Sequence, residues 1–221
     1  MGAAGVGGET SDPQPGMDEV SKSDPEWAHV AVLLEKHRGS YSFKVTRVWK
    51  VRTCAQFQEY ETKASALGKP TQLFHGTSHG AARRIAAEGF KLPRHSGMYG
   101  PGLYFAHSPF KSADYAPESS WSPFFRRWAA KGCWAALCGE KETGQMLVCD
   151  VYLGSCKRAG GSSSVHDPAK DLKGGWFREL LGLGDYNSIY APGWLFHSEY
   201  VVYQEHQAVP RYLIEFDCVR I

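Results

Sequence analysis

Residues 72–115 hold the side chains whose types and spacing are best suited to chemistry. The stretch contains a His-Gly-Thr turn at 75–77, a glycine-rich loop at 97–102 and a segment at 110–115 with lysine, serine and tyrosine. Glycine lets a backbone approach a ligand closely, and aromatic rings such as that of Tyr104 offer faces for stacking. A single His-Gly or Gly-x-Gly element is typical of an ordinary turn. Several of them within one stretch instead indicate a binding site for a small planar ligand.

Short strands and a helix are expected to position these residues. A buried strand over 71–74 would deliver His75 to the edge of a sheet, and a helix over 81–87 would end at Gly89. A further strand over 103–106 follows the glycine-rich loop. Because that loop does not open a helix, the fingerprint of dinucleotide-binding Rossmann domains is rejected.

The rest of the chain alternates strands with a few helices. Asp24 is predicted to cap a helix that begins at Pro25 and runs to about Arg38. The remaining predicted elements are a strand over 41–51, a helix over about 55–66, and strands or turns over 145–153, 186–190, 199–204 and 211–219. Many strands with few helices indicate the α+β class or a mostly β sandwich.

The organisation of the chain follows from shifts in composition. Residues 1–23 have few large hydrophobic side chains and are expected to form a disordered tail, which leaves 24–221 as one domain. An aromatic-rich insertion is expected at about 117–144. Its interleaved arginines would also suit single-stranded nucleic acid, but a packed insertion is favoured. Residues 154–184 are expected to be a long, mobile polar loop.

Composition and charge bound the class of protein. The 221 residues are 43% hydrophobic, enough for a packed core, and the formal net charge is +2. This near-neutral charge gives no reason to expect a nucleic-acid partner. No run of hydrophobic residues is long enough to span a membrane, and the N-terminus lacks the pattern of a signal peptide. The protein is therefore expected to be intracellular, either cytoplasmic or nuclear.

The cysteines do not form a clear metal site. The chain contains six cysteines at irregular spacings, and reduced thiols are expected. Cys133 and Cys138 could be half of a metal site, but Cys149 falls inside a predicted strand and His166 lies far along the chain. Tetrahedral closure is not supported, so no metal is expected.

The motifs, taken in order from about Trp27 to the C-terminus, resemble the catalytic domain of the poly(ADP-ribose) polymerase family, which consists of diphtheria-toxin-like ADP-ribosyltransferases. The matching segments are 75–77 (the HGS/HGT turn), 97–106 (G-x-x-G-x-G-[IL]-Y-F-A), 111–115 (K-S-x-x-Y), 145–147 with 153–154, 187–189 (D-S-V), 199–203 (E-Y-I-V-Y), and 207 with 210–214 (Q…P-x-Y-L-I). Each piece is weak alone, but seven in register are specific.

The resemblance implies a split antiparallel β sandwich with flanking helices and NAD as the substrate. It implies an H-Y-E triad of His75, Tyr104 and Glu199, in which His75 and Glu199 hold ribose hydroxyls. Gly76 and Ser112 would hold the nicotinamide carboxamide between the rings of Tyr104 and Tyr115. The expected catalytic residues are Glu199, His75 and Tyr104, and the expected NAD-binding residues are His75, Gly76, Thr77, Tyr104, Ala106, Lys111, Ser112 and Tyr115. Lys91 or Arg94, in a short loop, is the candidate contact for the pyrophosphate.

The implied reaction transfers ADP-ribose from NAD to protein acceptors and releases nicotinamide. Cleavage of the bond to a positively charged nicotinamide passes through an oxocarbenium-like transition state, which a nearby carboxylate stabilises. Glu199 permits elongation to poly(ADP-ribose) without requiring it, and a polymer product is slightly favoured. The alternatives are transfer of single units, a catalytically silent NAD or ADP-ribose reader of the same fold, and a related transferase acting on nucleic-acid ends.

Overall fold

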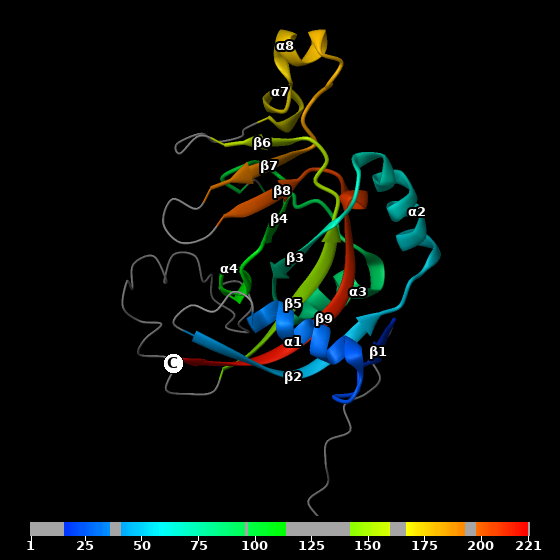
Figure 1. Cartoon of the computed structure of the whole chain (residues 1–221), viewed down its shortest axis with the longest axis vertical. Coiled ribbons are helices and arrows are strands. Elements are labelled where there is room, and N and C mark those ends of the chain that lie inside the picture. The colour runs from blue at the N-terminus through cyan, green and yellow to red at the C-terminus, as the bar shows by residue number, and fades with distance from the viewer. Residues whose placement is uncertain are drawn as a thin grey trace, which may run out of the picture.

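The computed structural model describes residues 16–35, 41–95, 97–113, 142–159, 167–192 and 198–220 (Figure 1). The strands are β1 (Met17–Glu19), β2 (Tyr41–Val51), β3 (Thr71–Gly76), β4 (Leu103–Ala106), β5 (Glu142–Val151), β6 (Cys156–Arg158), β7 (Ser188–Ala191), β8 (Glu199–Val202) and β9 (Ala208–Arg220). The helices are α1 (Pro25–Glu35), α2 (Ala55–Ala64), α3 (His79–Glu88), α4 (Pro109–Ala113), α7 (Pro168–Asp171) and α8 (Gly175–Leu180), with 3₁₀ turns η1 (Ser65–Leu67) and η2 (Glu205–Gln207). The predicted α+β class is confirmed.

The strands form one sheet that is split near its middle. Their order is β1-β2-β9-β5-β3-β4-β8-β7-β6, and every neighbouring pair is antiparallel except β6 with β7. Between β3 and β4 the single register pair joins Phe74 to Ala106. After that pair, His75 and Gly76 still pair with residues of β5 but have no register partner on β4. The sheet therefore divides there into two antiparallel parts, in agreement with the predicted split fold.

Helices cover both faces of the larger part. Val30 and Leu34 of α1 pack in one hydrophobic cluster, while Phe57 of α2 and Ala82 of α3 pack in the other (Figure 1). The central strands must therefore be hydrophobic on both faces, which explains the continuous hydrophobic run of β5. In β2 a register shift after Val45 changes which alternate residues face α1.

The N-terminal boundary differs from the expected tail of residues 1–23. Residues 17–19 form β1, which pairs with β2, and the side chains of Met17 and Val20 are only 3% and 7% exposed. Two hydrophobic residues among polar ones show no alternation long enough to indicate a strand. Residues 1–15 lie outside the described part of the chain.

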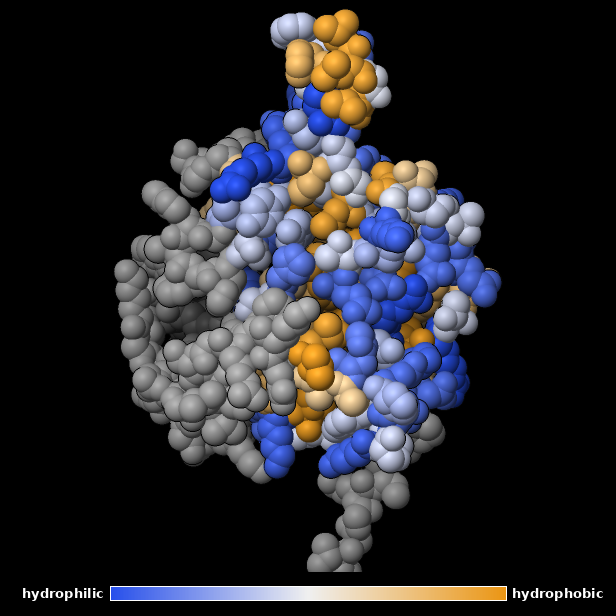
Figure 2. All heavy atoms as spheres, viewed as in Figure 1, coloured by the Kyte–Doolittle hydropathy of each residue, from blue (hydrophilic) through white to orange (hydrophobic). Residues whose placement is uncertain are grey.

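The segment 154–184 is also more ordered than predicted, because its described part contains β6, α7 and α8. The Asp167 carboxylate caps α7, and the Arg178 guanidinium stacks 4.1 Å from the ring centroid of Tyr186 and donates to the Gly184 carbonyl. Hydrophobic side chains lie on the surface of this part of the molecule, as the projecting tip in Figure 2 shows. The exposed hydrophobic residues of this tip are Trp176, Phe177, Leu180, Leu181 and Leu183.

Two other predicted segments fall partly outside the residues that the structure describes. The insertion at about 117–144 lies outside them up to residue 141, and β5 begins at Glu142. The first helix, expected to reach Arg38, is described as α1 up to Glu35. Within the described ranges, no helix is long and hydrophobic enough to cross a membrane.

Candidate active site

His75 lies where β3 and β4 diverge, and its side chain bridges them. Its Nδ1 is 2.9 Å from the backbone oxygen of Tyr104, so it makes the link that the backbone ladder does not. Because a carbonyl can only accept, this contact assigns the ring proton to Nδ1. Burial lowers the pKa of His75, which favours the neutral ring. Nε2 is then left as an acceptor that suits the hydroxyl of a sugar.

Two aromatic side chains fix the orientation of the His75 ring. Its centroid lies 5.1 Å from that of Phe90 and 5.4 Å from that of Phe105. Phe90 is buried and follows Gly89, whose φ of 79° ends α3. The end of α3 thus sets the position of the histidine ring.

Gly76 lets α4 approach β3 more closely than any side chain would permit. A Cβ at this position would lie 1.7 Å from the backbone oxygen of Ser112, so glycine is required. The contact brings Lys111 and the buried Ser112 beside the end of β3. Thr77 follows directly and is half-buried.

The hydroxyl of Tyr104 organises the glycine-rich loop. It accepts from the N–H of Tyr99 and donates to the carbonyl of Gly100, both at 2.9 Å. A Cβ on Gly97 would lie 2.5 Å from the same hydroxyl oxygen, so the loop packs directly on it. The Tyr203 hydroxyl holds the far side of the loop by donating to the Tyr99 carbonyl at 2.6 Å. The hydroxyl of Tyr104 is thus committed to the loop, and a ligand would meet its ring.

Glu199 begins β8 and faces a lysine from α4. Its register partner on β4 is Ala106, so Tyr104, Ala106 and Glu199 share one face of that strand pair. The Oε1 atom of Glu199 lies 3.6 Å from Nζ of Lys111, and both side chains are mostly buried. Burial and, secondarily, the negative charge of Glu199 raise the pKa of Tyr99. A carboxylate and an ammonium group therefore meet beside the glycine-rich loop.

The structure brings most of the predicted site residues together. Direct contacts or register pairs join His75 to Tyr104, Gly76 to Ser112, and Glu199 to both Ala106 and Lys111. Tyr115 is outside the described residues, so its expected position beside Tyr104 stays a prediction. The roles of all these residues toward NAD stay predictions as well.

Three residues that sequence reasoning did not assign to the site also contribute to it. Phe90 supports the His75 ring, Tyr99 anchors the loop on Tyr104, and Glu205 holds the segment that follows Phe90. Tyr99 stands inside the recognised glycine-rich motif, which is a usable signal. The contacts of Phe90 and Glu205 depend on tertiary structure, and no local pattern marks them.

Within the described ranges, no group of three or more His, Cys, Asp or Glu side chains could hold a metal ion. Cys133 and Cys138 lie outside those ranges. The expectation of no metal stays a prediction, to be checked by metal analysis of the purified protein.

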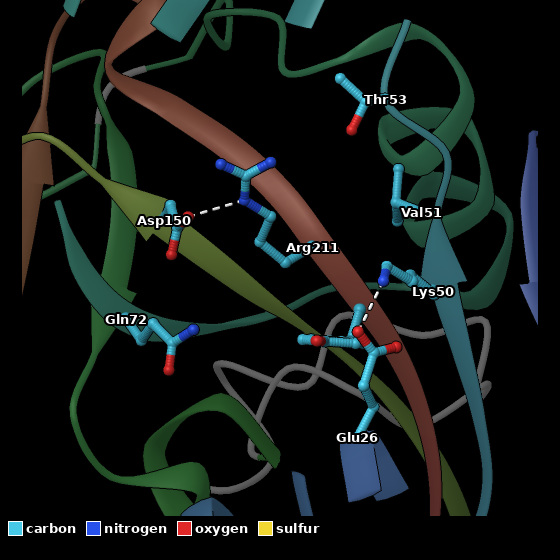
Figure 3. Close-up of a pocket in the computed structure, with 8 residues that line it drawn as sticks. Glu26, Lys50, Val51, Thr53, Gln72, Asp150 and Arg211 are labelled. Atoms are coloured by element: carbon cyan, nitrogen blue, oxygen red, sulfur yellow. Dashed lines mark hydrogen bonds and ion pairs between the residues drawn. The ribbon is translucent and has the colours of Figure 1, made fainter. Parts of the chain in front are cut away.

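A polar hollow of about 210 Å³ lies apart from the residues of the candidate site (Figure 3). Its lining residues are Glu26, Lys50, Val51, Thr53, Gln72, Asp150, Arg211 and Tyr212. Gln72 and His75 have opposite parity on β3, so their side chains point to opposite faces of the sheet. Lys50 pairs with Glu26 at 2.5 Å, and Arg211 pairs with Asp150 at 2.6 Å. These internal pairs neutralise the charges of the hollow.

Comparisons with known proteins agree with this geometry. The family model of the poly(ADP-ribose) polymerase catalytic domain matches residues 25–175. The chain is 26% identical over 220 residues to protein mono-ADP-ribosyltransferase PARP3 of Mus musculus, a match that covers 89% of this chain and 38% of that protein. The Homo sapiens protein of the same name is 26% identical over 215 residues, covering 86% and 37%. The Gallus gallus protein is 27% identical over 194 residues, covering 77% and 33%. The chain thus spans about a third of the length of these relatives.

Proposed function

With residues 25–175 matching that model, the chain belongs to the poly(ADP-ribose) polymerase catalytic domain family, and we propose that it is an NAD-dependent ADP-ribosyltransferase acting on proteins. One observation carries the proposal. Glu199 meets Lys111 beside the opening between β3 and β4, and the neutral His75 lies at the same opening. Enzymes of this family use NAD as their substrate, and the close approach of α4 to Gly76 places side by side the two residues expected to hold the nicotinamide carboxamide, Gly76 and Ser112.

In this proposal, named side chains bind the ribose of NAD and stabilise the positive charge that develops in the reaction. His75, protonated on Nδ1, offers Nε2 to a ribose hydroxyl. The Glu199 carboxylate holds the nicotinamide ribose and stabilises the positive charge that develops as the glycosidic bond breaks. Lys111 keeps that carboxylate oriented by its ion pair. Nicotinamide departs with the bonding electron pair as a neutral molecule, so this site needs no general acid.

We propose transfer of single ADP-ribose units. The three relatives are named mono-ADP-ribosyltransferases, which supports this choice. Elongation uses a ribose hydroxyl as the nucleophile and gains from a base, whereas transfer to an acidic side chain does not need one. Glu199 leaves elongation chemically feasible, so a polymer product is the second candidate.

Incubation with labelled NAD and a protein acceptor tests the proposal. We expect nicotinamide release together with a discrete labelled band on a gel. A ladder of products would identify elongation instead. Binding of NAD without nicotinamide release would identify a silent reader of the same fold and overturn the proposed activity.

Replacement of the carboxylate tests the role of Glu199. Glu199→Gln keeps the shape and one hydrogen bond but removes the negative charge. We expect transfer to fall by about 100- to 10,000-fold, the range typical for loss of a charged catalytic group. Glu59→Gln, which alters an exposed carboxylate of α2 paired with Lys63, is the matched control and should keep full activity. Unchanged transfer by Glu199→Gln would remove this residue from the reaction.

The location proposed for this activity is inside the cell. Cys54, Cys149 and Cys156 carry free thiols in the described part of the chain, which suits a reducing compartment. Imaging of the tagged protein tests the proposal, and secretion would contradict it.

A further inference from the structure

The segment 91–95 connects two residues of the candidate site. It begins directly after Phe90, which supports the His75 ring, and it leads toward Gly97, which packs on the Tyr104 hydroxyl. All five of its residues are exposed. A segment fixed at both ends by the site but exposed along its length needs a further contact to hold one position.

Glu205 supplies such a contact from the other end of the chain. Its Oε1 atom accepts a hydrogen bond from the N–H of Leu92 at 3.1 Å, and its Oε2 atom lies 3.3 Å from Nζ of Lys91. The ammonium of Lys91, a candidate contact for pyrophosphate, is therefore held at the start of the segment. One carboxylate engages both the backbone and a side chain of the segment.

Glu205 is presented by a rigid turn. The turn η2 is closed by reciprocal hydrogen bonds between Gln204 and Gln207. The buried amide of Gln207 donates to the carbonyls of Tyr152 and Asn187 at 3.0 and 3.1 Å. Because this turn is tied into the body of the domain, it is the fixed partner of the contact, and the segment 91–95 is the part that it positions.

We infer that Glu205 is a positioning residue for NAD binding, which it promotes by holding the segment 91–95 through the N–H of Leu92. The inference rests on the proposed function. A segment that is already in place loses less conformational freedom when a ligand binds beside it. Glu205 thus contributes to affinity for NAD and leaves the rate of the bound complex unchanged.

Two substitutions of Glu205 and a matched control test this inference. Glu205→Ala removes both contacts, and we expect KM for NAD to rise about three- to tenfold while kcat stays within about twofold. Glu205→Gln keeps an oxygen acceptor for the N–H of Leu92 and should restore most of the affinity. Asp185→Ala is the matched control, because it removes the same kinds of contact, to Nζ of Lys173 and to the N–H of Gly174, beside α8, and it should change neither constant.

Amide hydrogen exchange of segment 91–95, without NAD, gives a readout that does not depend on activity. We expect faster exchange in Glu205→Ala and nearly normal exchange in Glu205→Gln, with unchanged melting temperatures. Unchanged exchange or unchanged KM in Glu205→Ala overturns the inference, as does a Glu205→Gln protein that behaves like Glu205→Ala. Absence of NAD binding by the unmodified protein overturns the proposed function as well, so the two failures are distinguishable.

Discussion

Among the glycines in the described part of the chain, Gly76 is the one at which a Cβ would meet its neighbours most closely. The atom nearest to a Cβ at this position would be the backbone oxygen of Ser112, which cannot rotate away as a side chain would. Gly76→Ala must therefore push α4 from β3, and we expect a loss of about 1–3 kcal/mol in the free energy of unfolding together with weaker NAD binding. Urea denaturation and calorimetry measure these effects.

The control for this substitution is Gly80→Ala. A Cβ on Gly80 of α3 meets nothing within 4 Å, and alanine favours the helix, so stability should not fall. Equal stability of both variants would show that α4 can move away from Gly76 without cost.

His75 should make the stability of the fold depend on pH. Burial lowers its pKa below the ordinary value of 6.5, so the unfolded chain binds the proton more readily than the folded one. The free energy of unfolding should therefore fall as pH drops below about 6.5, with a slope of at most about 1.4 kcal/mol per pH unit from this residue. Urea titrations between pH 5 and 8 measure the slope.

The substitution His75→Gln isolates this contribution. The amide that it introduces can still donate to the Tyr104 carbonyl but does not titrate, so the slope should decrease. His206, whose pKa burial also lowers, remains in this variant and accounts for part of the slope that persists. An identical slope in His75→Gln and the unmodified protein would contradict the prediction.

The candidate site residues could be named from the sequence because each stands in a recognisable motif, as His75 and Glu199 do at strand ends. The contacts between these residues could not be predicted from the sequence. The ion pair of Glu199 with Lys111 depends on the pairing of Glu199 with Ala106 and on the docking of α4 at Gly76. Neither the register nor the docking leaves a local pattern in the sequence.

At the scale of elements, the length of a helix or strand decided whether it could be predicted from the sequence. The eleven residues of β2 alternate clearly and were predicted with the observed bounds, Tyr41–Val51. The register shift within β2 was not predicted, because the alternating residues before and after the shift form one continuous hydrophobic pattern in the sequence. The elements β1, β6 and α7 have three or four residues each, too few for a period to repeat.

The short strand β1 provides the prediction at this scale. Met17 is buried against the sheet, and a buried methionine contributes about 2–5 kcal/mol relative to alanine. Deletion of residues 1–23 should therefore lower the melting temperature by several degrees. Deletion of residues 1–15, which keeps β1, is the control and should cost little. Equal melting temperatures after the two deletions would show that β1 adds no stability.

At the scale of the whole molecule, the two sides of the split bury hydrophobic clusters of different size, and the largest cluster crosses the split through Leu103, Phe105 and Val202. The part that contains β5 and β9 packs against α1 on one face and against α2 and α3 on the other. The part that contains β7 and β8 has a smaller cluster around Ile189 and Val201. One backbone pair, Phe74 with Ala106, joins β3 to β4 across the split. The candidate site thus lies between a larger and a smaller body.

This asymmetry predicts that the smaller part opens first. Local opening requires less free energy where fewer hydrophobic side chains are buried, so the amides of β7 and β8 should exchange at a lower opening free energy than those of β5 and β9. Ile189→Ala should speed exchange in β7 and β8 and leave β5 and β9 nearly unchanged, while Leu147→Ala, a buried residue of β5, should speed exchange throughout. Hydrogen exchange resolved along the chain makes the comparison. If Ile189→Ala accelerates all strands equally, the two parts unfold as one cooperative unit and the split carries no separate stability.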